Sequence, residues 1–340
     1  MSIPDAGGVL LVDKPRGPTS FDVVRWARRA LRTREIGHTG TLDPMATGML
    51  AILVGNATRL SSWLTSERKV YRAEITLHTE TDSLDADGVI TRTLGNAADP
   101  SRVEVERAVA AMVGPQMQVP PVVSAIKIDG VAAHERVRRG ETLDLPARSV
   151  ELIKAQVLDV QGHVVQVELV TSKGFYVRSF ARDLAQALGT VAHLTALRRV
   201  SSGLFSVTDA LDGRVLERAA SRDESAEAAV RSALRSVTEL ETTLPSLRVS
   251  LSCAHLLSHG KRAPREEPWA TLALGEKLAL CDSPGGLIAV GIVQLEEDGV
   301  TVVRNFPTEW LRASAKRASD ALMDTAETEP TDLSNPDAAS

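Results

Sequence analysis

A glycine-rich loop that holds one carboxylate is the strongest candidate for chemistry in this chain. Residues 37–43 spell Gly-His-Thr-Gly-Thr-Leu-Asp, and Gly37 and Gly40 allow the backbone to approach a ligand closely. The carboxylate of Asp43 could serve as a nucleophile or as a general base. The loop side chains that can form hydrogen bonds beside it are His38, Thr39 and Thr41. The alternative is an Asx-type turn in which Asp43 caps nearby N–H groups, and the residue types leave both interpretations open.

A second polar cluster occupies residues 172–178, where Lys173, Tyr176 and Arg178 lie within seven positions. These residues could contribute a cation and an aromatic ring to a site. An ordinary turn from a strand to a helix, with Arg178 on the surface, would have the same composition.

Sequence patterns for metal and nucleotide chemistry are missing. The chain has no Walker loop, no dinucleotide fingerprint, no zinc-protease spacing and no G-x-S-x-G elbow. Asp85-Ala86-Asp87-Gly88 looks like part of a calcium loop, but Ser83 and Leu94 stand where that loop requires oxygen-rich ligands. We therefore expect an enzyme that uses neither a metal nor a cofactor.

The total charge by itself argues against a nucleic-acid partner, but its distribution along the chain permits one. The net charge is -5, but residues 1–80 carry 11 Lys and Arg against 8 Asp and Glu, whereas residues 311–340 carry 3 against 6. Cys253 and Cys281 form neither a disulfide framework nor a metal motif, which favours the cytoplasm. No apolar run is long enough to span a membrane, and residues 1–17 lack the pattern of a signal peptide.

The elements that must position these residues mix strands and helices without a regular βαβ repeat. Residues 9–12 predict a buried strand, and the alternation over residues 70–77 predicts a strand with Tyr71 on its apolar face. Residues 165–169 predict another strand, and residues 177–188 a helix that Gly189 ends. Together these patterns indicate an α+β catalytic domain.

A helix beginning near Thr19 and Ser20 should follow the first strand, with Asp22 completing a capping box. Its apolar side is formed by Val24, Ala27 and Leu31, and its opposite side by a basic stripe, Arg25, Arg28, Arg29 and Arg32. Without interleaved acids these arginines repel one another. The stripe is either a solvated face or a contact for phosphate groups, and both remain open.

The C-terminal part predicts three further regions. A polar helix over residues 217–236 connects to a small β-rich domain over 241–310, with strands near 247–251, 277–281, 287–293 and 300–303. Residues 311–340 have the composition of a disordered acidic tail.

Six blocks, in order, resemble the bacterial tRNA pseudouridine-55 synthases of the TruB type. They are GVLLVDKPRGPTSFDVV, GHTGTLDPMATGMLAILVGNATRL, KVYRAEITLHTETDSLDADG, PPVVSAIKIDG, SKGFYVRSFARDLAQALG and LTALRRVSSGLFS. The resemblance covers roughly residues 8–210, and residues 241–310 resemble, more weakly, the PUA-type RNA-binding domain of that family. It implies a mixed-sheet pseudouridine synthase domain over residues 1–240, with an RNA-gripping insertion at about 120–148.

The resemblance also implies roles for individual residues. The catalytic set would be Asp43 as the essential aspartate, Tyr71 against the target base and Arg178 paired with the aspartate. The substrate-binding set would be His38, Tyr176, Leu197, Lys14, Thr41, Lys127 and Arg199, with Lys14 and Pro15 also buttressing the active site.

By this resemblance the substrate is the T-arm of tRNA, and the T-loop uridine at position 55 is isomerised. The base must leave the stack and enter a pocket. Arg178 is expected to keep Asp43 ionised by lowering its pKa. The carboxylate would then attack covalently or abstract a proton from the sugar, and the sequence does not choose between these routes.

This chain departs from the family pattern inside the insertion, at Val123, Ala133 and His134, which affects RNA contacts rather than chemistry. We expect the basic residues of the insertion to contact phosphate groups, namely Lys127, Arg136, Arg138 and Arg139.

Three other functions compete with this hypothesis. They are a pseudouridine synthase acting on another RNA, a non-catalytic RNA-binding protein, and a glycoside hydrolase with paired carboxylates, which the lack of a partner acid near Asp43 disfavours. The sequence predicts a monomer, since no long heptad or exposed apolar stripe is present.

Overall fold

The computed structural model describes residues 7–65, 68–124, 127–128, 131–132, 136, 139, 141, 143–236, 246–249, 253, 256, 261–264, 277–282, 291–296 and 299–305. The chain divides into two compact units, and the larger consists of Val9–Val54 and Leu60–Leu234. The candidate residues whose side chains the structure describes all lie in this larger unit.

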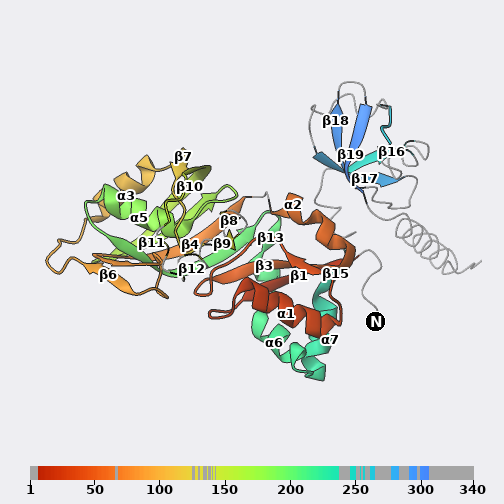
Figure 1. The fold of residues 1–340 in the computed structure, drawn as a ribbon, viewed down its shortest axis with the longest axis horizontal. Helices are drawn as coiled ribbons and strands as arrows, with labels where there is room; N and C mark the ends of the chain where they lie inside the picture. Colours follow the sequence, from red (N-terminus) through yellow and green to blue (C-terminus); the bar gives the residue numbers. More distant parts are fainter. Residues whose placement is uncertain are drawn as a thin grey trace, which may run out of the picture. The chain divides into compact units, whose positions relative to one another are not determined.

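A long mixed sheet forms the centre of the larger unit, as predicted (Figure 1). Its strands, in spatial order, are β14 (Leu211–Asp212), β1 (Gly8–Lys14), β3 (Thr47–Val54), β12 (Ala192–Ser202), β4 (Lys69–Leu77), β11 (Val164–Thr171), β10 (Arg148–Gln161) and β7 (Gly114–Gln118), with β2 (Ile36–His38) beside β3 and β13 (Phe205–Ser206) beside β12. Pairing is parallel between β12 and β3 and between β1 and β14, and antiparallel from β12 through β4, β11 and β10 to β7. This mixture agrees with the α+β class.

The burial pattern of each strand agrees with its position in the sheet. In β3 every residue after Thr47 is buried, as expected for a central strand covered on both faces. In β4 buried and less buried residues alternate, with Tyr71, Ala73, Ile75 and Leu77 buried, so the predicted period of two is confirmed. The predicted strands at residues 9–12 and 165–169 correspond to β1 and β11.

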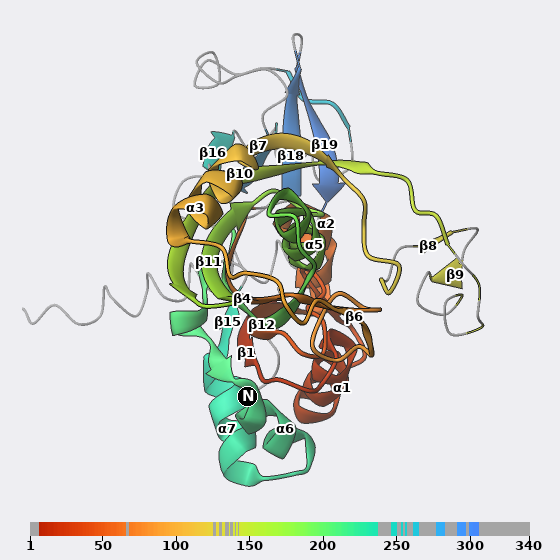
Figure 2. The ribbon, with the colours of Figure 1, turned by 90° about the vertical axis from the view of Figure 1, so that its left-hand side faces the viewer.

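The helices form two groups. Among the α-helices that the structure describes in the larger unit are α1 (Ser20–Leu31), α2 (Ser61–Leu64), α3 (Arg102–Ala111), α5 (Val177–Ala187), α6 (Gly213–Ala220) and α7 (Glu224–Ala233). Helix α1 packs against α6 and α7, whereas α3 and α5 pack at the other end of the sheet, where Figure 2 shows β10 and β11 curving around α5. The predicted capping box of Thr19 and Asp22 is present at α1, and Gly189 follows α5 with φ +70°.

One helix prediction was wrong. Residues 217–236 do not form a continuous helix, because the chain turns at residues 221–223, where Arg222 has φ +73° and Asp223 caps a new helix, α7. A short strand, β15 (Leu234–Ser236), ends the segment. The composition of residues 217–236 favours one long helix, but Asp223 accepts a hydrogen bond as the N-cap of α7 and so starts a second helix.

Short elements complete the larger unit: the hairpins β5 (Thr79–Thr81) with β6 (Ile90–Thr93) and β8 (Lys127–Ile128) with β9 (Val131–Ala132), and the 3-10 helix η2 (Val207–Asp209). Another 3-10 helix, η1 (Gly55–Leu60), follows β3.

The smaller unit contains a separate sheet of order β16 (Ser246–Val249), β17 (Lys277–Asp282), β18 (Gly291–Glu296) and β19 (Gly299–Asn305). Four strands were predicted here, and residues 287–290 of the predicted third strand lie outside the described residues. The predicted acidic tail, residues 311–340, lies outside the described residues.

Candidate active site

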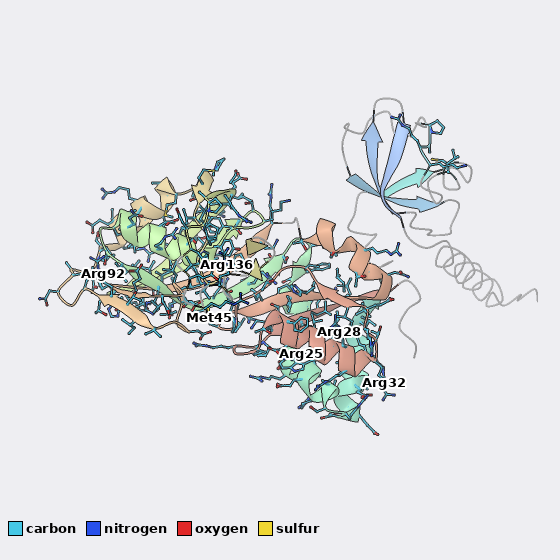
Figure 3. All side chains as sticks on the ribbon, viewed as in Figure 1. Arg25, Arg28, Arg32, Met45, Arg92 and Arg136 are labelled. Carbon is cyan, nitrogen blue, oxygen red and sulfur yellow. The ribbon has the colours of Figure 1, made fainter. Side chains whose placement is uncertain are left out.

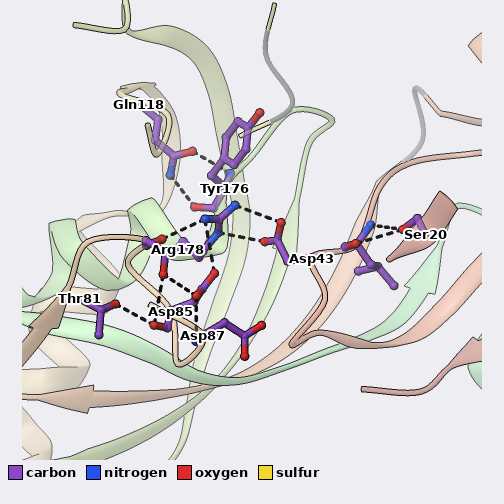
Figure 4. A network of polar contacts seen from close by, with 10 residues as sticks. Ser20, Asp43, Thr81, Asp85, Asp87, Gln118, Tyr176 and Arg178 are labelled. Carbon is purple, nitrogen blue, oxygen red and sulfur yellow. Dashed lines mark hydrogen bonds and ion pairs between the residues drawn. The ribbon is translucent and has the colours of Figure 1, made fainter. Parts of the chain in front are cut away.

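The loop that carries Asp43 is fixed by contacts on both sides of the carboxylate. On one side, Ser20 at the start of α1 accepts a hydrogen bond from the backbone N–H of Leu42 at 2.8 Å, and its hydroxyl lies 3.1 Å from the carbonyl of Leu42 (Figure 4). On the other side, the Lys14 ammonium donates to the carbonyl of Pro44 at 3.2 Å. The catalytic candidate is therefore held on a rigid loop rather than on a free turn.

Arg178 reaches Asp43 from the first turn of α5. Its Nη2 donates to Oδ1 of Asp43 at 3.0 Å, and its Nε lies 2.9 Å from Oδ2 (Figure 4). The arginine side chain is only 4% exposed, and its Nη1 donates to the carbonyl of Ser83 at 2.9 Å. The predicted pairing of Arg178 with Asp43 is present, and the interpretation of Arg178 as a surface residue is wrong.

A second carboxylate, Asp85, completes the network and was not predicted. Its Oδ2 lies 3.4 Å from Nη1 of Arg178, and its side chain is 7% exposed. Its Oδ1 accepts hydrogen bonds from the Ser83 hydroxyl at 2.6 Å and from the Asp87 backbone at 3.1 Å. The motif of Asp43 itself holds no partner acid, as expected, and it is the fold that brings Asp85 close. One guanidinium separates the two carboxylates, and Asp85 does not line the cavity described below.

Burial sets the protonation behaviour of Asp43. Desolvation raises the pKa of Asp43 above its ordinary value, and the carboxylate of Asp85 adds to this effect, whereas Arg178 and Lys14 oppose it. Arg178 thus acts in the predicted direction, in a site whose burial disfavours the charge, and the net shift is upward. A carboxylate with a raised pKa is a stronger base once it is ionised.

Asp43 opens onto a cavity of about 220 Å³. This volume is below the roughly 300–1,000 Å³ of pockets for drug-sized ligands, and it suits one flat ring. The lining residues are Gly40, Thr41, Leu42, Asp43, Thr65, Lys69, Tyr71, Lys173, Gly174, Phe175, Tyr176, Val177, Arg178, Leu197 and Arg199. Strands β4 and β12 therefore bring Tyr71 and Leu197, each 7% exposed, to the same cavity as the loop of Asp43.

Tyr176 immediately precedes α5, and burial raises the pKa of its phenol, which keeps the hydroxyl protonated at neutral pH. Arg199 is 1% exposed, and it donates from Nε to the carbonyl of Met49 at 2.6 Å and from Nη2 to that of Gly40 at 3.2 Å. Its position at the cavity wall fits the prediction, and its hydrogen bonds brace the loop. Thr41 lines the same cavity with an exposed side chain.

Two residues predicted to bind substrate do not line the cavity. Lys14 is fully buried, and its ammonium donates to the carbonyls of Pro15, Pro18 and Pro44, so it braces the backbone on either side of the turn before α1. Burial lowers the pKa of Lys14 to about 8. His38 lies on β2, where Nδ1 accepts from the Gly40 backbone at 3.2 Å, and burial lowers its pKa.

The basic stripe of α1 is partly neutralised. Arg25 pairs with Asp22 within the helix, and Arg32 lies 3.7 Å from Glu227 of α7 (Figure 3). No acid is interleaved within the stripe, as the sequence indicates, but acids outside it neutralise two of the four arginines, Arg25 and Arg32.

The predicted RNA-gripping insertion begins just after β7. Arg136 pairs with Glu141 at 2.6 Å, and Arg139 is exposed. The backbone of Lys127 lies in β8, but its side chain is outside the described residues, as are Arg138, Ala133 and His134. Val123 is half-buried.

The described part of the chain offers neither a metal site nor a membrane-spanning helix. No group of three or more His, Cys, Asp or Glu side chains there could hold a metal ion. No helix among those same residues is long and apolar enough to cross a membrane.

Comparison with known proteins gives two family matches. The TruB family pseudouridylate synthase N-terminal domain matches residues 28–177, and the tRNA pseudouridylate synthase B C-terminal domain matches residues 178–241. The tRNA pseudouridine synthase B of Leifsonia xyli subsp. xyli is 37% identical over 315 residues, which cover 89% of this chain and 97% of the relative. That of Paenarthrobacter aurescens is 41% identical over 291 residues, covering 82% and 92%.

Solved structures share the fold. A Cbf5–Nop10–Gar1 complex contains a chain that matches with a TM-score of 0.68 at 24% identity, covering 91% of this chain and 88% of that one. An H/ACA RNP bound to a substrate RNA containing 2'-deoxyuridine matches with a TM-score of 0.66 at 23% identity, covering 90% and 87%. At these identities the likeness establishes the architecture of the chain.

Proposed function

Because the chain belongs to the TruB family of pseudouridylate synthases, we propose that it isomerises one uridine of tRNA to pseudouridine, with the T-loop uridine at position 55 as its target and Asp43 as its essential residue. The observation that carries the proposal is the pairing of Asp43 with the buried Arg178 at the wall of a small cavity. A protein that only binds RNA has no need for a half-buried carboxylate facing a polyanion.

The cavity supports a mechanism that begins with extrusion of the base from the RNA stack. Stacking of the extruded uracil on Tyr71 would recover about 1–3 kcal/mol. Asp43 then acts as a nucleophile or as a base on the sugar, and the bond between N1 and C1' breaks. Uracil rotates within the cavity, C5 bonds to C1', C5 loses its proton and N1 gains one, so the reaction needs no external reactant.

The charges at the cavity favour an RNA substrate. Lys173 is exposed at the wall of the cavity, whereas the other lining cations, Lys69 and Arg199, are buried. Cations at such a mouth attract phosphate groups and raise the association rate.

The remaining parts of the chain complete the proposal. We assign residues 1–240 to catalysis, the insertion at about 120–148 to gripping the T-arm, residues 241–310 to a PUA-like RNA-binding role and residues 311–340 to an acidic tail. A monomer acting in the cytoplasm without a cofactor accords with the sequence.

The test uses unmodified tRNA transcript with tritium at uracil C5. Wild type should release tritium, Asp43→Asn should not, and replacement of the T-loop uridine should abolish release by wild type. The matched control is Asp13→Asn, because Asp13 also accepts two hydrogen bonds from an arginine, Arg198, at 3.0 and 2.7 Å, yet lies outside the cavity.

Activity of Asp13→Asn close to wild type would exclude a general effect of breaking an Asp–Arg pair. Tight tRNA binding by wild type without tritium release would refute the proposal and leave a non-catalytic RNA-binding protein. Release that persists after the T-loop uridine is replaced would point to another uridine or another RNA.

A further inference from the structure

Gln118 connects the root of the insertion to the helix that carries Arg178. It is the last residue of β7, and it is 2% exposed. Its side-chain Nε2 donates to the carbonyl of Tyr176 at 3.1 Å, and its Oε1 accepts from the backbone N–H of Tyr176 at 2.8 Å (Figure 4). One amide therefore binds both backbone groups of a single residue that is 58 positions away.

Tyr176 needs such a partner because of its place in the chain. It is the N-cap residue of α5, and its own side chain makes no capping hydrogen bond. The first N–H groups of a helix have no partner within the helix, so an amide from another strand can satisfy one of them. The Tyr176 carbonyl also accepts the first helical hydrogen bond, from the Phe180 N–H at 3.0 Å. A carbonyl oxygen has two lone pairs, so the second can accept from the Gln118 amide.

The next residue after Gln118 makes two more hydrogen bonds to α5. The carbonyl of Val119 accepts from the Ser179 hydroxyl at 2.8 Å and from Nη2 of Arg182 at 3.2 Å. Residues 118 and 119 are thus fastened to the first two turns of α5, on either side of Arg178.

The backbone direction at Tyr176 decides where two functional side chains point. The Tyr176 side chain lines the cavity, and Arg178 follows two residues later with its guanidinium on Asp43. A small rotation of this turn would move the phenol and the guanidinium together relative to the carboxylate.

We propose that Gln118 is a positioning residue for the isomerisation, and that it holds the Tyr176–Arg178 turn so that Arg178 meets Asp43 in the productive geometry. This inference rests on the proposed function.

The experiment compares Gln118→Leu, which removes both hydrogen bonds, with Gln118→Glu, which keeps the acceptor for the Tyr176 N–H and has nearly the same volume. The matched control is Gln116→Leu, the same change two residues earlier in β7, where the Gln116 amide donates to the Met112 carbonyl at 3.2 Å. Single-turnover tritium release with excess enzyme, filter binding of tRNA and the pH profile of the rate are measured for all four proteins.

Gln118→Leu should lose roughly 10- to 100-fold in single-turnover rate, since a misplacement of about 1 Å costs about that much, while tRNA affinity stays near wild type. The acidic limb of its pH–rate profile, where activity falls as pH drops, should move to higher pH. Displacement of Arg178 weakens its attraction to the Asp43 carboxylate, which is what keeps the pKa of Asp43 from rising further. Gln118→Glu should lose less, and Gln116→Leu should match wild type.

A Gln118→Leu rate and acidic limb equal to those of Gln116→Leu would overturn the inference. A parallel loss of rate and tRNA binding with an unchanged acidic limb would overturn it too, because that is the signature of a merely structural role. If Gln118→Leu does not fold, Gln118→Glu with unchanged rate and pH profile would be decisive against it. A wild-type protein that releases no tritium would refute both proposals, whereas active wild type beside unaffected Gln118 variants would refute this one alone.

Discussion

Replacement of Arg178 by Met should destabilise the protein and slow the reaction for the same electrostatic reason. The change removes the guanidinium that contacts Asp43 and Asp85, and that side chain is 4% exposed. Breaking a buried ion pair costs about 3–5 kcal/mol, because the remaining charge is left unpaired. Asp43 keeps 32% of its side chain exposed and Asp85 retains two other donors, so we expect about 3 kcal/mol, the low end of that range.

This loss corresponds to a fall in Tm of about 6–12 °C for a unit of this size, measurable by thermal unfolding. The rate of tritium release at saturating tRNA should fall about 100-fold through misplacement of the carboxylate. The active form of Asp43 is the ionised one, so activity is lost as pH falls through its pKa. Without Arg178, burial and Asp85 raise that pKa further, and the acidic limb should move to higher pH.

The matched control is Arg214→Met, in which an exposed ion pair with Glu217 at 2.7 Å is broken. Exposed pairs contribute about 0–1 kcal/mol, so this variant should remain close to wild type in stability and activity. If Arg178→Met loses no more stability than Arg214→Met and keeps its acidic limb, the argument that Arg178 stabilises buried carboxylates is wrong.

Three further outcomes follow from the same structure. The stability of Asp43→Asn relative to wild type should increase as pH rises from below 3.8, the ordinary pKa of the carboxyl, to 7, because a raised folded-state pKa means that ionisation of Asp43 disfavours the fold. Equal urea midpoint differences at both pH values would contradict this. Ser20→Ala should lower the free energy of unfolding in urea by about 1–3 kcal/mol and slow tritium release, since the Leu42 N–H loses its acceptor beside the Asp43 carboxylate. Unchanged stability would show that the Ser20–Leu42 hydrogen bonds do not hold the loop. Arg139→Gln should reduce the slope of log affinity for tRNA against log salt by about 1, and an unaltered slope would remove Arg139 from the RNA interface.

The features predicted well from sequence are those whose cause is local. Alternation alone places Tyr71 on the buried face of β4, and Gly189 alone ends α5. The loop of Asp43 is also recognisable, because glycines and hydrogen-bonding side chains concentrate within seven residues.

The features that were missed depend on distant partners. Asp85 lies in a turn whose acidic and glycine residues are explained by the turn itself. Only the contact with Arg178, which lies 93 positions later in the chain, connects Asp85 to the site of Asp43. Gln118 is a neutral side chain in a short strand, and its partner is 58 positions away. The resemblance gave Lys14 both a substrate-binding and a buttressing role, and only the fold shows that backbone carbonyls receive its ammonium.

The strand order has a consequence for synthesis. Strand β12 is among the last strands of the larger unit to be made, yet it lies between β3 and β4 and supplies Leu197 and Arg199 to the cavity. A ribosome that adds about 5–20 residues per second needs on the order of ten seconds to pass from β3 to β12. During that interval β3 and β4 lack the strand that joins them, and an unpaired strand edge can pair with another chain. The nascent protein is therefore inactive and prone to aggregate until residue 202 has emerged, so a chain cut short before β12 should accumulate as insoluble material rather than as a weak enzyme.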